Sequence, residues 1–168
     1  VHIYCGDGKG KTTTCVGLTV RAAGSGKKVL FYQFLKNNSS SERSILEKQL
    51  GINVVSGKEL QKFTFQMNEE ELKELRDYNN EMLDKLFEMA KDYDMLVLDE
   101  SVYSIDKDLL DEAKLIEHLE KKPFALEVVL SGRNPSERLI DHADYVSEIR
   151  KIKHPFDQGI SSRIGIEM

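Results

Sequence analysis

The stretch Val1-His2-Ile3-Tyr4-Cys5-Gly6-Asp7-Gly8-Lys9-Gly10-Lys11-Thr12-Thr13 decides the fold that we expect for this chain. Its first five residues are mostly apolar and β-prone, a glycine-rich turn follows, and a helix-compatible segment begins at Lys11. Glycines allow a tight turn whose backbone N–H groups point inward, and these groups bind anions together with the N-terminus of the next helix. The order strand, turn and helix therefore predicts a phosphate-binding loop over residues 6–13.

The residues of this loop have distinct expected roles. We expect Lys11 to contact terminal phosphates and the hydroxyl of Thr12 to hold a divalent metal ion. The spacing departs from the usual pattern, because three residues rather than four separate Gly6 from Gly10. A Gly/Lys-rich surface turn without a ligand is the alternative, but it does not explain the order of the elements. The full set expected to bind the nucleotide within the loop is Gly6, Asp7, Gly8, Lys9, Gly10, Lys11, Thr12 and Thr13.

Length and composition indicate one nucleotide-binding domain over residues 1–168. Hydrophobic residues make up 40% and charged residues 32% of the chain, which is typical of globular proteins. The net charge of −5 argues against a nucleic-acid partner, and no apolar run reaches the roughly 20 residues of a membrane span. The first residues read as a core strand rather than a signal peptide. Cys5 and Cys15 lie in segments expected to be buried, so we expect free thiols and a cytoplasmic location.

Strand-like and helix-like segments alternate along the chain. We expect strands over residues 1–5, 29–34, 53–56, 95–99, 126–131 and 145–152, and helices over 11–23, 42–50, 69–92, 109–120 and 136–143. Continuously apolar strands separated by helices are typical of a parallel sheet covered on both faces. The predicted fold class is therefore α/β, with three layers and a mostly parallel sheet in a RecA-like phosphate-loop fold.

The second chemical marker is the apolar strand over residues 95–99, which ends in Asp99 and is followed by Glu100. In a parallel sheet its carboxyl end lies at the same edge as the phosphate loop. Carboxylates at that edge suit a divalent metal that bridges protein and phosphates, so we expect Thr12, Asp99 and Glu100 to hold Mg²⁺ or Mn²⁺. Alone, such a strand end is equally well explained as an ordinary solvated acid.

Further motifs resemble those of the corrinoid adenosyltransferases of the CobA/BtuR type, in order and over nearly the whole chain. That family shares the shortened loop, and it follows the loop with a helix that carries Arg-Ala and a glycine-rich stop. The other matching segments are Gln33-Phe34-Leu35-Lys36, Leu98-Asp99-Glu100 with Tyr103, Ser131-Gly132-Arg133-Asn134, Ala143-Asp144-Tyr145-Val146-Ser147-Glu148 and Lys153-His154-Pro155-Phe156-Asp157-Gln158-Gly159-Ile160.

The resemblance implies transfer of the 5′-deoxyadenosyl group of ATP to Co(I) of a corrinoid, with release of triphosphate, as in cobalamin biosynthesis. ATP and the corrinoid would be substrates, Mg²⁺ or Mn²⁺ the metal, and a reductase or flavodoxin-like protein the electron donor. The family also implies a homodimer. No side chain need act as a nucleophile, so catalysis would consist of positioning and of charge stabilisation by Lys11.

The resemblance also implies a place for the corrinoid. Family members carry a Phe-Thr-Trp stretch whose aromatic rings crowd the lower face of the corrin and displace its lower ligand. The matching residues are Phe63 and Phe65, so a phenylalanine replaces the tryptophan. The alternative is that both rings fold back onto the core. Many family members also have a segment before the first strand that helps close the corrinoid site; the chain begins at that strand, as expected for a removed segment or for a short variant with a more open site.

Two arginines and two classes of function remain open at this level. Arg133 follows a strand at the expected ligand edge and could contact nucleotide or form a surface salt bridge, and Arg21 matches a family arginine expected to contact nucleotide. Glu42 and Arg43 match a family Gly-Glu-Arg stretch that could approach the nucleotide. The alternatives to adenosyl transfer are a small-molecule or nucleoside kinase with a RecA-like core, and a non-catalytic sensor of ATP or corrinoid.

Overall fold

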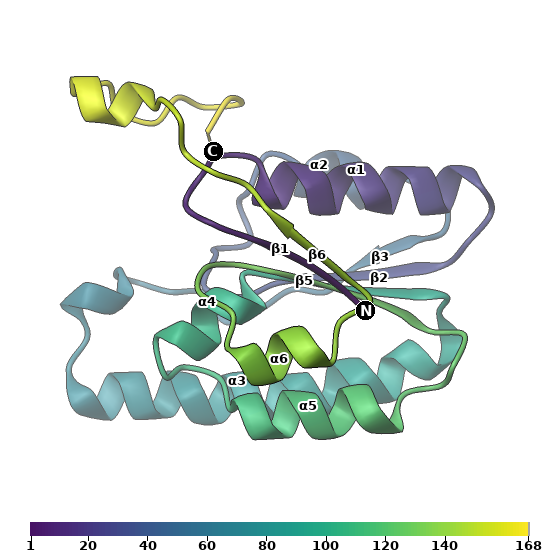
Figure 1. Ribbon diagram of the computed structural model, residues 1–168. Helices are drawn as coiled ribbons and strands as arrows, with labels where there is room; N and C mark the ends of the chain where they lie inside the picture. Colours follow the sequence, from purple (N-terminus) through teal and green to yellow (C-terminus); the bar gives the residue numbers. More distant parts are fainter. Residues whose placement is uncertain (168) are drawn as a thin grey trace.

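A six-stranded, all-parallel sheet forms the centre of the computed structural model, which describes residues 1–167 (Figure 1). Its strands are β1 (His2–Cys5), β2 (Val29–Gln33), β3 (Ile52–Val54), β4 (Met95–Asp99), β5 (Glu127–Ser131) and β6 (Tyr145–Glu148). They lie in the order β3-β2-β4-β5-β1-β6, so β5 separates β1 from the acidic strand β4. Because every pair is parallel, all six carboxyl ends meet at one edge.

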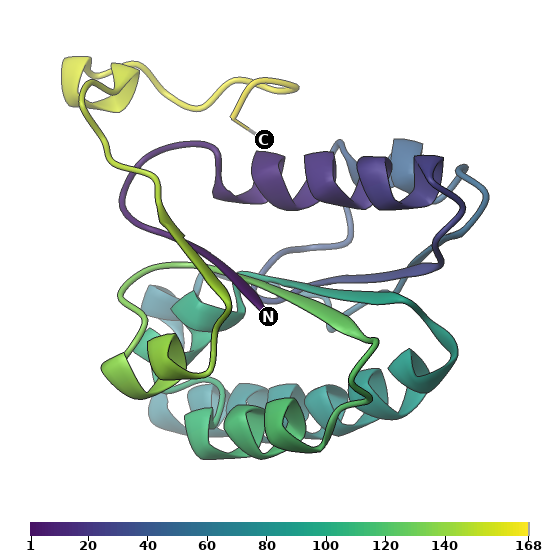
Figure 2. The same cartoon turned by 45° about the vertical axis from the view of Figure 1, so that its right-hand side comes forward.

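Helices cover both faces of this sheet, which confirms the predicted α/β fold class (Figure 2). On one face lie α1 (Lys11–Gly24) and the short α2 (Arg43–Leu46). The other face carries α3 (Glu69–Met89), α4 (Ser101–Asp106), α5 (Glu112–Lys121) and α6 (Glu137–Asp141). Three 3₁₀ turns are described at η1 (Thr64–Gln66), η2 (Ala90–Asp92) and η3 (Pro155–Gln158). Among residues 1–167, no helix combines the length and apolar character that crossing a membrane requires.

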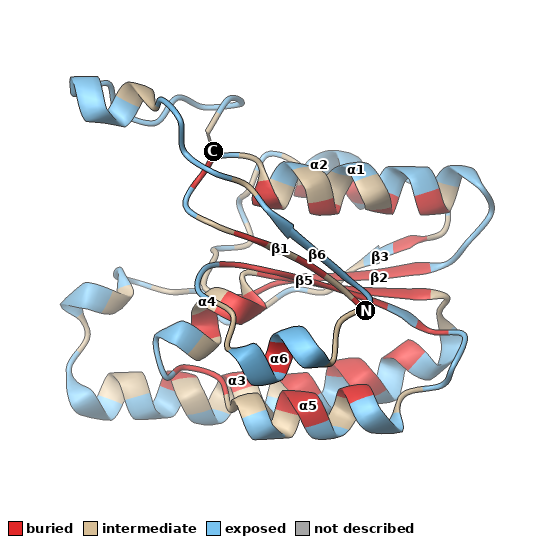
Figure 3. Ribbon diagram, in the orientation of Figure 1, coloured by how far each residue is buried: buried red, intermediate tan, exposed pale blue. Residues whose placement is uncertain are grey.

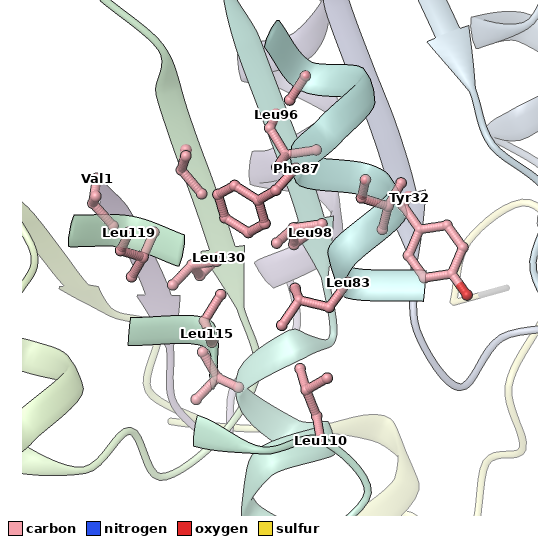
Figure 4. Packing of buried hydrophobic residues seen from close by; sticks show 14 of the residues in the cluster. Val1, Tyr32, Leu83, Phe87, Leu96, Leu98, Leu110, Leu115, Leu119 and Leu130 are labelled. Carbon is pink, nitrogen blue, oxygen red and sulfur yellow. The ribbon is translucent and has the colours of Figure 1, made fainter. Parts of the chain in front are cut away.

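The core has two halves because successive side chains of a strand point to opposite faces. In β4, Leu96 and Leu98 pack toward α3 and α5, whereas Met95 and Val97 pack toward α1. Leu83 of α3 closes the larger half (Figure 4). Full burial of one such side chain stabilises the fold by about 1.5–3 kcal/mol. Burial is therefore concentrated on the central strands and the sheet-facing sides of the helices, while β6 is exposed at the edge (Figure 3).

Two predicted helix starts are confirmed by their capping hydrogen bonds. The side chain of Asn68 accepts from the N–H of Glu71, and the Glu71 carboxylate accepts from the N–H of Asn68, which forms a capping box at the start of α3. The hydroxyl of Ser136 accepts from the N–H of Leu139 and opens α6. These two helix starts could be predicted from the sequence because each capping hydrogen bond joins residues within one helical turn.

The structure departs most from the sequence prediction at three places. The helix expected over 42–50 is reduced to α2, because the guanidinium of Arg43 turns inward to the Val55 carbonyl and pins the segment to the end of β3. The strand expected over 145–152 ends at Glu148, since the Ile149 carbonyl turns to the glycine-rich loop. Helix α4 was not predicted; it starts after Glu100, whose φ of 61° reverses the chain at the end of β4.

Candidate functional site

The glycine-rich loop leaves β1 at the carboxyl edge of the sheet and enters α1 at Lys11. Gly6 and Gly10 have φ of 108° and 128°, a region that residues with a Cβ rarely adopt. The Gly8 N–H donates to the Ile149 carbonyl at 2.7 Å. A Cβ at Gly6 or Gly8 would lie 2.4 or 2.7 Å from that oxygen, so the chain after β6 packs against the loop and requires glycine there.

The C-terminal segment extends this contact. The exposed carboxylate of Asp7 accepts from the N–H of Lys151 at 2.9 Å, and this hydrogen bond lowers the pKa of Asp7. Beyond it the chain passes above the β1–α1 turn (Figure 1). Asp7 therefore holds the C-terminal segment in the structure, a role that the sequence did not indicate.

Lys11 is buried beneath the loop, with only 8% of its surface exposed. Its ammonium donates to the Gly8 carbonyl at 2.8 Å. Burial lowers the pKa of Lys11, while the carboxylate of Glu100 acts in the opposite direction. A lysine held inside a glycine-rich turn at the start of a helix is the arrangement that a phosphate-binding loop requires.

Asp99 is the centre of a buried hydrogen-bond network at the end of β4, with no exposed surface. Its Oδ1 accepts from the Ser131 hydroxyl at 2.6 Å. Its Oδ2 accepts from the Thr12 hydroxyl at 3.1 Å, from Gln33 Nε2 at 3.1 Å and from Lys36 Nζ at 3.0 Å. The network joins α1, β2, β4 and β5, so the structure brings together Thr12 and Asp99 as the sequence predicted.

Lys36 was missed as a site residue, although it stands in a matched family segment directly after β2. Its Nζ lies 2.9 Å from Thr12 Oγ1 and 3.0 Å from Asp99 Oδ2. The preceding residue, Leu35, has a φ of 54°, an uncommon conformation for a residue with a Cβ. Burial alone would lower the pKa of Lys36, but the carboxylate of Asp99 outweighs it and the pKa is raised. Lys36 is therefore a charged member of the site.

Glu100 lies beside this network in a left-handed conformation, and its N–H donates to the Ser131 hydroxyl at 2.9 Å. Burial and the neighbouring carboxylate of Asp99 raise the pKa of Glu100. Glu42 also joins, because its Oε1 accepts from Gln33 Nε2 at 2.8 Å. The carboxylates of Asp99, Glu100 and Glu42 therefore surround the Lys36 ammonium. The distance from Lys36 Nζ to Glu42 Oε1 is 3.9 Å.

These oxygens suit a hard divalent cation. The Thr12 hydroxyl and the Asp99 carboxylate are within one hydrogen-bond length of each other, and oxygen donors of this kind bind Mg²⁺. The Oε1 of Gln33 is buried and has no hydrogen-bond partner among the described residues. Because Gln33 Nε2 faces two carboxylates, its Oε1 is left as a free acceptor that a metal-bound water could satisfy. The residues present therefore fit the metal that the sequence predicted.

A cavity of about 320 Å³ opens beside the network. Its lining brings together the predicted residues Lys11, Glu100 and Arg133. Arg133 is exposed and forms no ion pair within residues 1–167, so the surface salt bridge considered as its alternative is absent there. The remaining lining residues are Leu35, Lys36 and Tyr103.

A larger cavity, of about 590 Å³, lies at the opposite edge of the sheet. Among the described residues, Lys28 and Asp92 are the only charged ones that line it. The smaller cavity carries three cations next to a buried carboxylate network. Chemistry rather than size therefore identifies the cavity at the carboxyl edge as the candidate site for an anionic ligand.

Arg21 is not brought to this cavity. It is exposed in the last turn of α1, ten residues after Lys11 and therefore about 15 Å further along the helix. Arg43 is also directed elsewhere, because its guanidinium donates to the Val55 carbonyl and to the Ser56 hydroxyl. Among residues 1–167, no observed geometry supports the nucleotide contacts expected of these two arginines.

Phe63 and Phe65 stand in the segment between β3 and α3, with 71% and 81% of their surfaces exposed. Their rings stack with centroids 5.4 Å apart and an interplanar angle of 8°. The alternative that both rings fold back onto the core is therefore wrong. The segment lies on the same side of the molecule as the turn between β1 and α1 (Figure 1).

Comparison with known proteins gives one consistent result. The family described as "ATP:corrinoid adenosyltransferase BtuR/CobO/CobP" matches residues 1–168. A relative from Escherichia coli K12, named "Corrinoid adenosyltransferase", is 33% identical over 99% of this chain and 84% of its own length. "Corrinoid adenosyltransferase CobA" of Salmonella typhimurium LT2 is 34% identical over the same shares, and a "Corrinoid adenosyltransferase" of Sinorhizobium sp is 35% identical over 99% and 79%.

Proposed function

The chain belongs to the family of ATP:corrinoid adenosyltransferases, and we propose that it transfers the 5′-deoxyadenosyl group of ATP to Co(I) of a corrinoid. The electron pair of Co(I) attacks C5′ of the ribose, a Co–C bond forms, and the C5′–O bond breaks. That bonding pair leaves with the oxygen of inorganic triphosphate, so atoms and electrons balance without a protein nucleophile.

The observation that carries this proposal is the cluster of three cations around one cavity at the carboxyl edge. Lys11, Lys36 and Arg133 line it together. In adenosyl transfer, negative charge grows on the whole triphosphate as it leaves, and fixed cations stabilise that charge most strongly in the transition state. We assign Lys11 to the triphosphate, with Arg133 at the mouth of the cavity.

The proposed metal site consists of the Thr12 hydroxyl, the Asp99 carboxylate and, at the cavity wall, Glu100. Bound Mg²⁺ or Mn²⁺ would neutralise charge on the triphosphate. The Ser131 hydroxyl orients Asp99 by donating to its other oxygen, and it also accepts from the Glu100 N–H. Ser131 therefore orients the Asp99 carboxylate and holds the backbone of Glu100 beside it.

For the corrinoid, we propose that the stacked rings of Phe63 and Phe65 provide the apolar surface that contacts its lower face. Two adjacent, exposed aromatic side chains are unusual on a surface without a partner, and they suit a large flat macrocycle. Removal of the lower ligand by such rings would leave cobalt easier to reduce to Co(I).

Three further aspects belong to this proposal. A reductase or flavodoxin-like protein would supply the electron that makes Co(I). A homodimer would cover the corrinoid, and the exposed edge strand β6 offers a surface for it. We place the reaction in the cytoplasm, in keeping with the free, buried thiols of Cys5 and Cys15.

The test is an anaerobic assay with chemically reduced cob(I)alamin, ATP and Mg²⁺. We expect a light-sensitive Co–C bond and one triphosphate for each adenosylcorrinoid formed. ADP formation with a small-molecule acceptor would instead identify a kinase, and ATP binding without any product would identify a sensor. Either result would overturn the proposed transfer.

A further inference from the structure

Lys36 occupies the place in the network where a divalent cation would be expected. Its ammonium lies between Thr12 Oγ1, at 2.9 Å, and Asp99 Oδ2, at 3.0 Å. These are the same two oxygens that the proposed metal site would use. The position between the Thr12 hydroxyl and the Asp99 carboxylate can hold an ammonium group or a metal ion, but not both at once.

We propose that the Lys36 ammonium is the resident cation of the Thr12–Asp99 site, and that a divalent metal enters only by displacing it. The inference rests on the proposed ATP site, because the metal would arrive with the triphosphate. Competition with Lys36 thus weakens metal binding to the nucleotide-free protein, and a ligand able to receive the released ammonium strengthens it. The established family reaction does not by itself require such competition.

The surroundings of Lys36 allow the displacement. Its side chain is 28% exposed and lines the cavity together with Lys11 and Arg133. A released ammonium therefore moves toward the space in which the triphosphate is proposed to bind. Without an anion there, it would approach two other cations, and like charges repel.

The contacts of Asp99 explain why this site needs a cation at all. Asp99 is completely buried, the carboxylate of Glu100 lies beside it, and Glu42 accepts from the same Gln33 Nε2 as Asp99 does. A buried carboxylate without a counter-charge is strongly unfavourable. The ammonium of Lys36 neutralises Asp99 in the nucleotide-free protein, as the metal would do in the complex.

The test is a Mn²⁺ titration of the nucleotide-free protein, with free Mn²⁺ measured by electron paramagnetic resonance. Since two charge-assisted contacts no longer compete, we expect Lys36→Met to bind Mn²⁺ roughly ten-fold or more tightly than wild type. Lys36→Arg retains a cation and should stay near wild type. Lys27→Met removes the same charge from an exposed position at the opposite edge of the sheet and is the matched control.

Equal or weaker Mn²⁺ binding by Lys36→Met, with native circular dichroism, would overturn the proposal. If Lys36→Met does not fold, Lys36→Gln replaces it in the Mn²⁺ titration, with the same expected result. A second experiment uses the wild type alone. In wild-type protein brought to saturation with Mn²⁺, acetylation of Lys36, followed by mass spectrometry, should increase while that of Lys27 does not; an unchanged Lys36 rate would overturn the proposal. None of these readouts uses a corrinoid, so failure of adenosyl transfer is detected separately.

Discussion

Replacement of Gly8 by alanine tests the contact between the glycine-rich loop and the C-terminal segment. The new Cβ would lie 2.7 Å from the Ile149 carbonyl oxygen, 2.8 Å from the Arg150 carbonyl carbon and 2.9 Å from its oxygen. All three are backbone atoms, so no side-chain rotation relieves the overlap. Either the loop or the segment after β6 must move.

The expected cost follows from two terms. Overpacking of a close-packed site costs about 1–3 kcal/mol. Movement also breaks the 2.7 Å hydrogen bond from the Gly8 N–H to the Ile149 carbonyl, which is worth about 1 kcal/mol. The sum is about 2–4 kcal/mol, and for a chain of this size it lowers Tm by about 4–16 °C.

Differential scanning calorimetry of Gly8→Ala and Gly17→Ala measures this effect. Gly17 is exposed within α1, and a Cβ added there meets nothing within 4 Å. Because alanine favours a helix by about 1 kcal/mol over glycine, Gly17→Ala should match or exceed the wild-type Tm. A Gly8→Ala protein as stable as wild type would refute the reasoning and show that the C-terminal segment does not pack on the loop.

The other predictions concern charge and the aromatic pair. Lys11→Ala should abolish adenosyl transfer in the cob(I)alamin assay because the triphosphate loses its buried cation. The control variant Lys27→Ala changes an exposed lysine and should keep its activity. Full activity of the Lys11 variant would contradict the role of Lys11. Phe65→Ala should slow transfer by about ten-fold when the enzyme starts from Co(II), a loss of about 1.4 kcal/mol, and much less from Co(I); equal rates from Co(II) would rule out the proposed crowding. The raised pKa of Glu100 means that the folded protein holds its proton more tightly, so stability falls as pH rises from the ordinary value of 4.5. Glu100→Gln should therefore gain stability relative to wild type between pH 4 and pH 7 in urea unfolding, and a constant difference would exclude this effect.

Much of the fold could be predicted because its signals are local. Apolar runs placed β2, β4 and β5 within one or two residues, and the closely spaced glycines and lysines after β1 indicated the phosphate-binding turn. Helix α4 escaped prediction because it is only six residues long and starts from the left-handed Glu100 rather than from a capping side chain. A conformation of that kind leaves no periodic pattern.

The site was predicted in part for the same reason. Lys11, Thr12, Asp99 and Glu100 follow recognisable strand or loop signals, and the structure places them together. Lys36 also follows a strand, so the rule that ligands bind at the carboxyl ends of parallel strands could have identified it. Its bond to Thr12 could not be foreseen, since it depends on the 54° φ of Leu35.

By itself, the sequence determined the class of the fold, the chemistry of the loop and the family resemblance, because these depend on residue type, spacing and short-range periodicity. The tertiary structure alone decided which side chains meet. The strand order inserts β5 between β1 and β4 and brings Ser131 onto Asp99, and the exit of β6 sets Ile149 against Gly8. The length of α1 carries Arg21 away from the cavity. Such contacts join residues far apart in the chain, and strand order and register fix them. No local sequence pattern specifies either strand order or register.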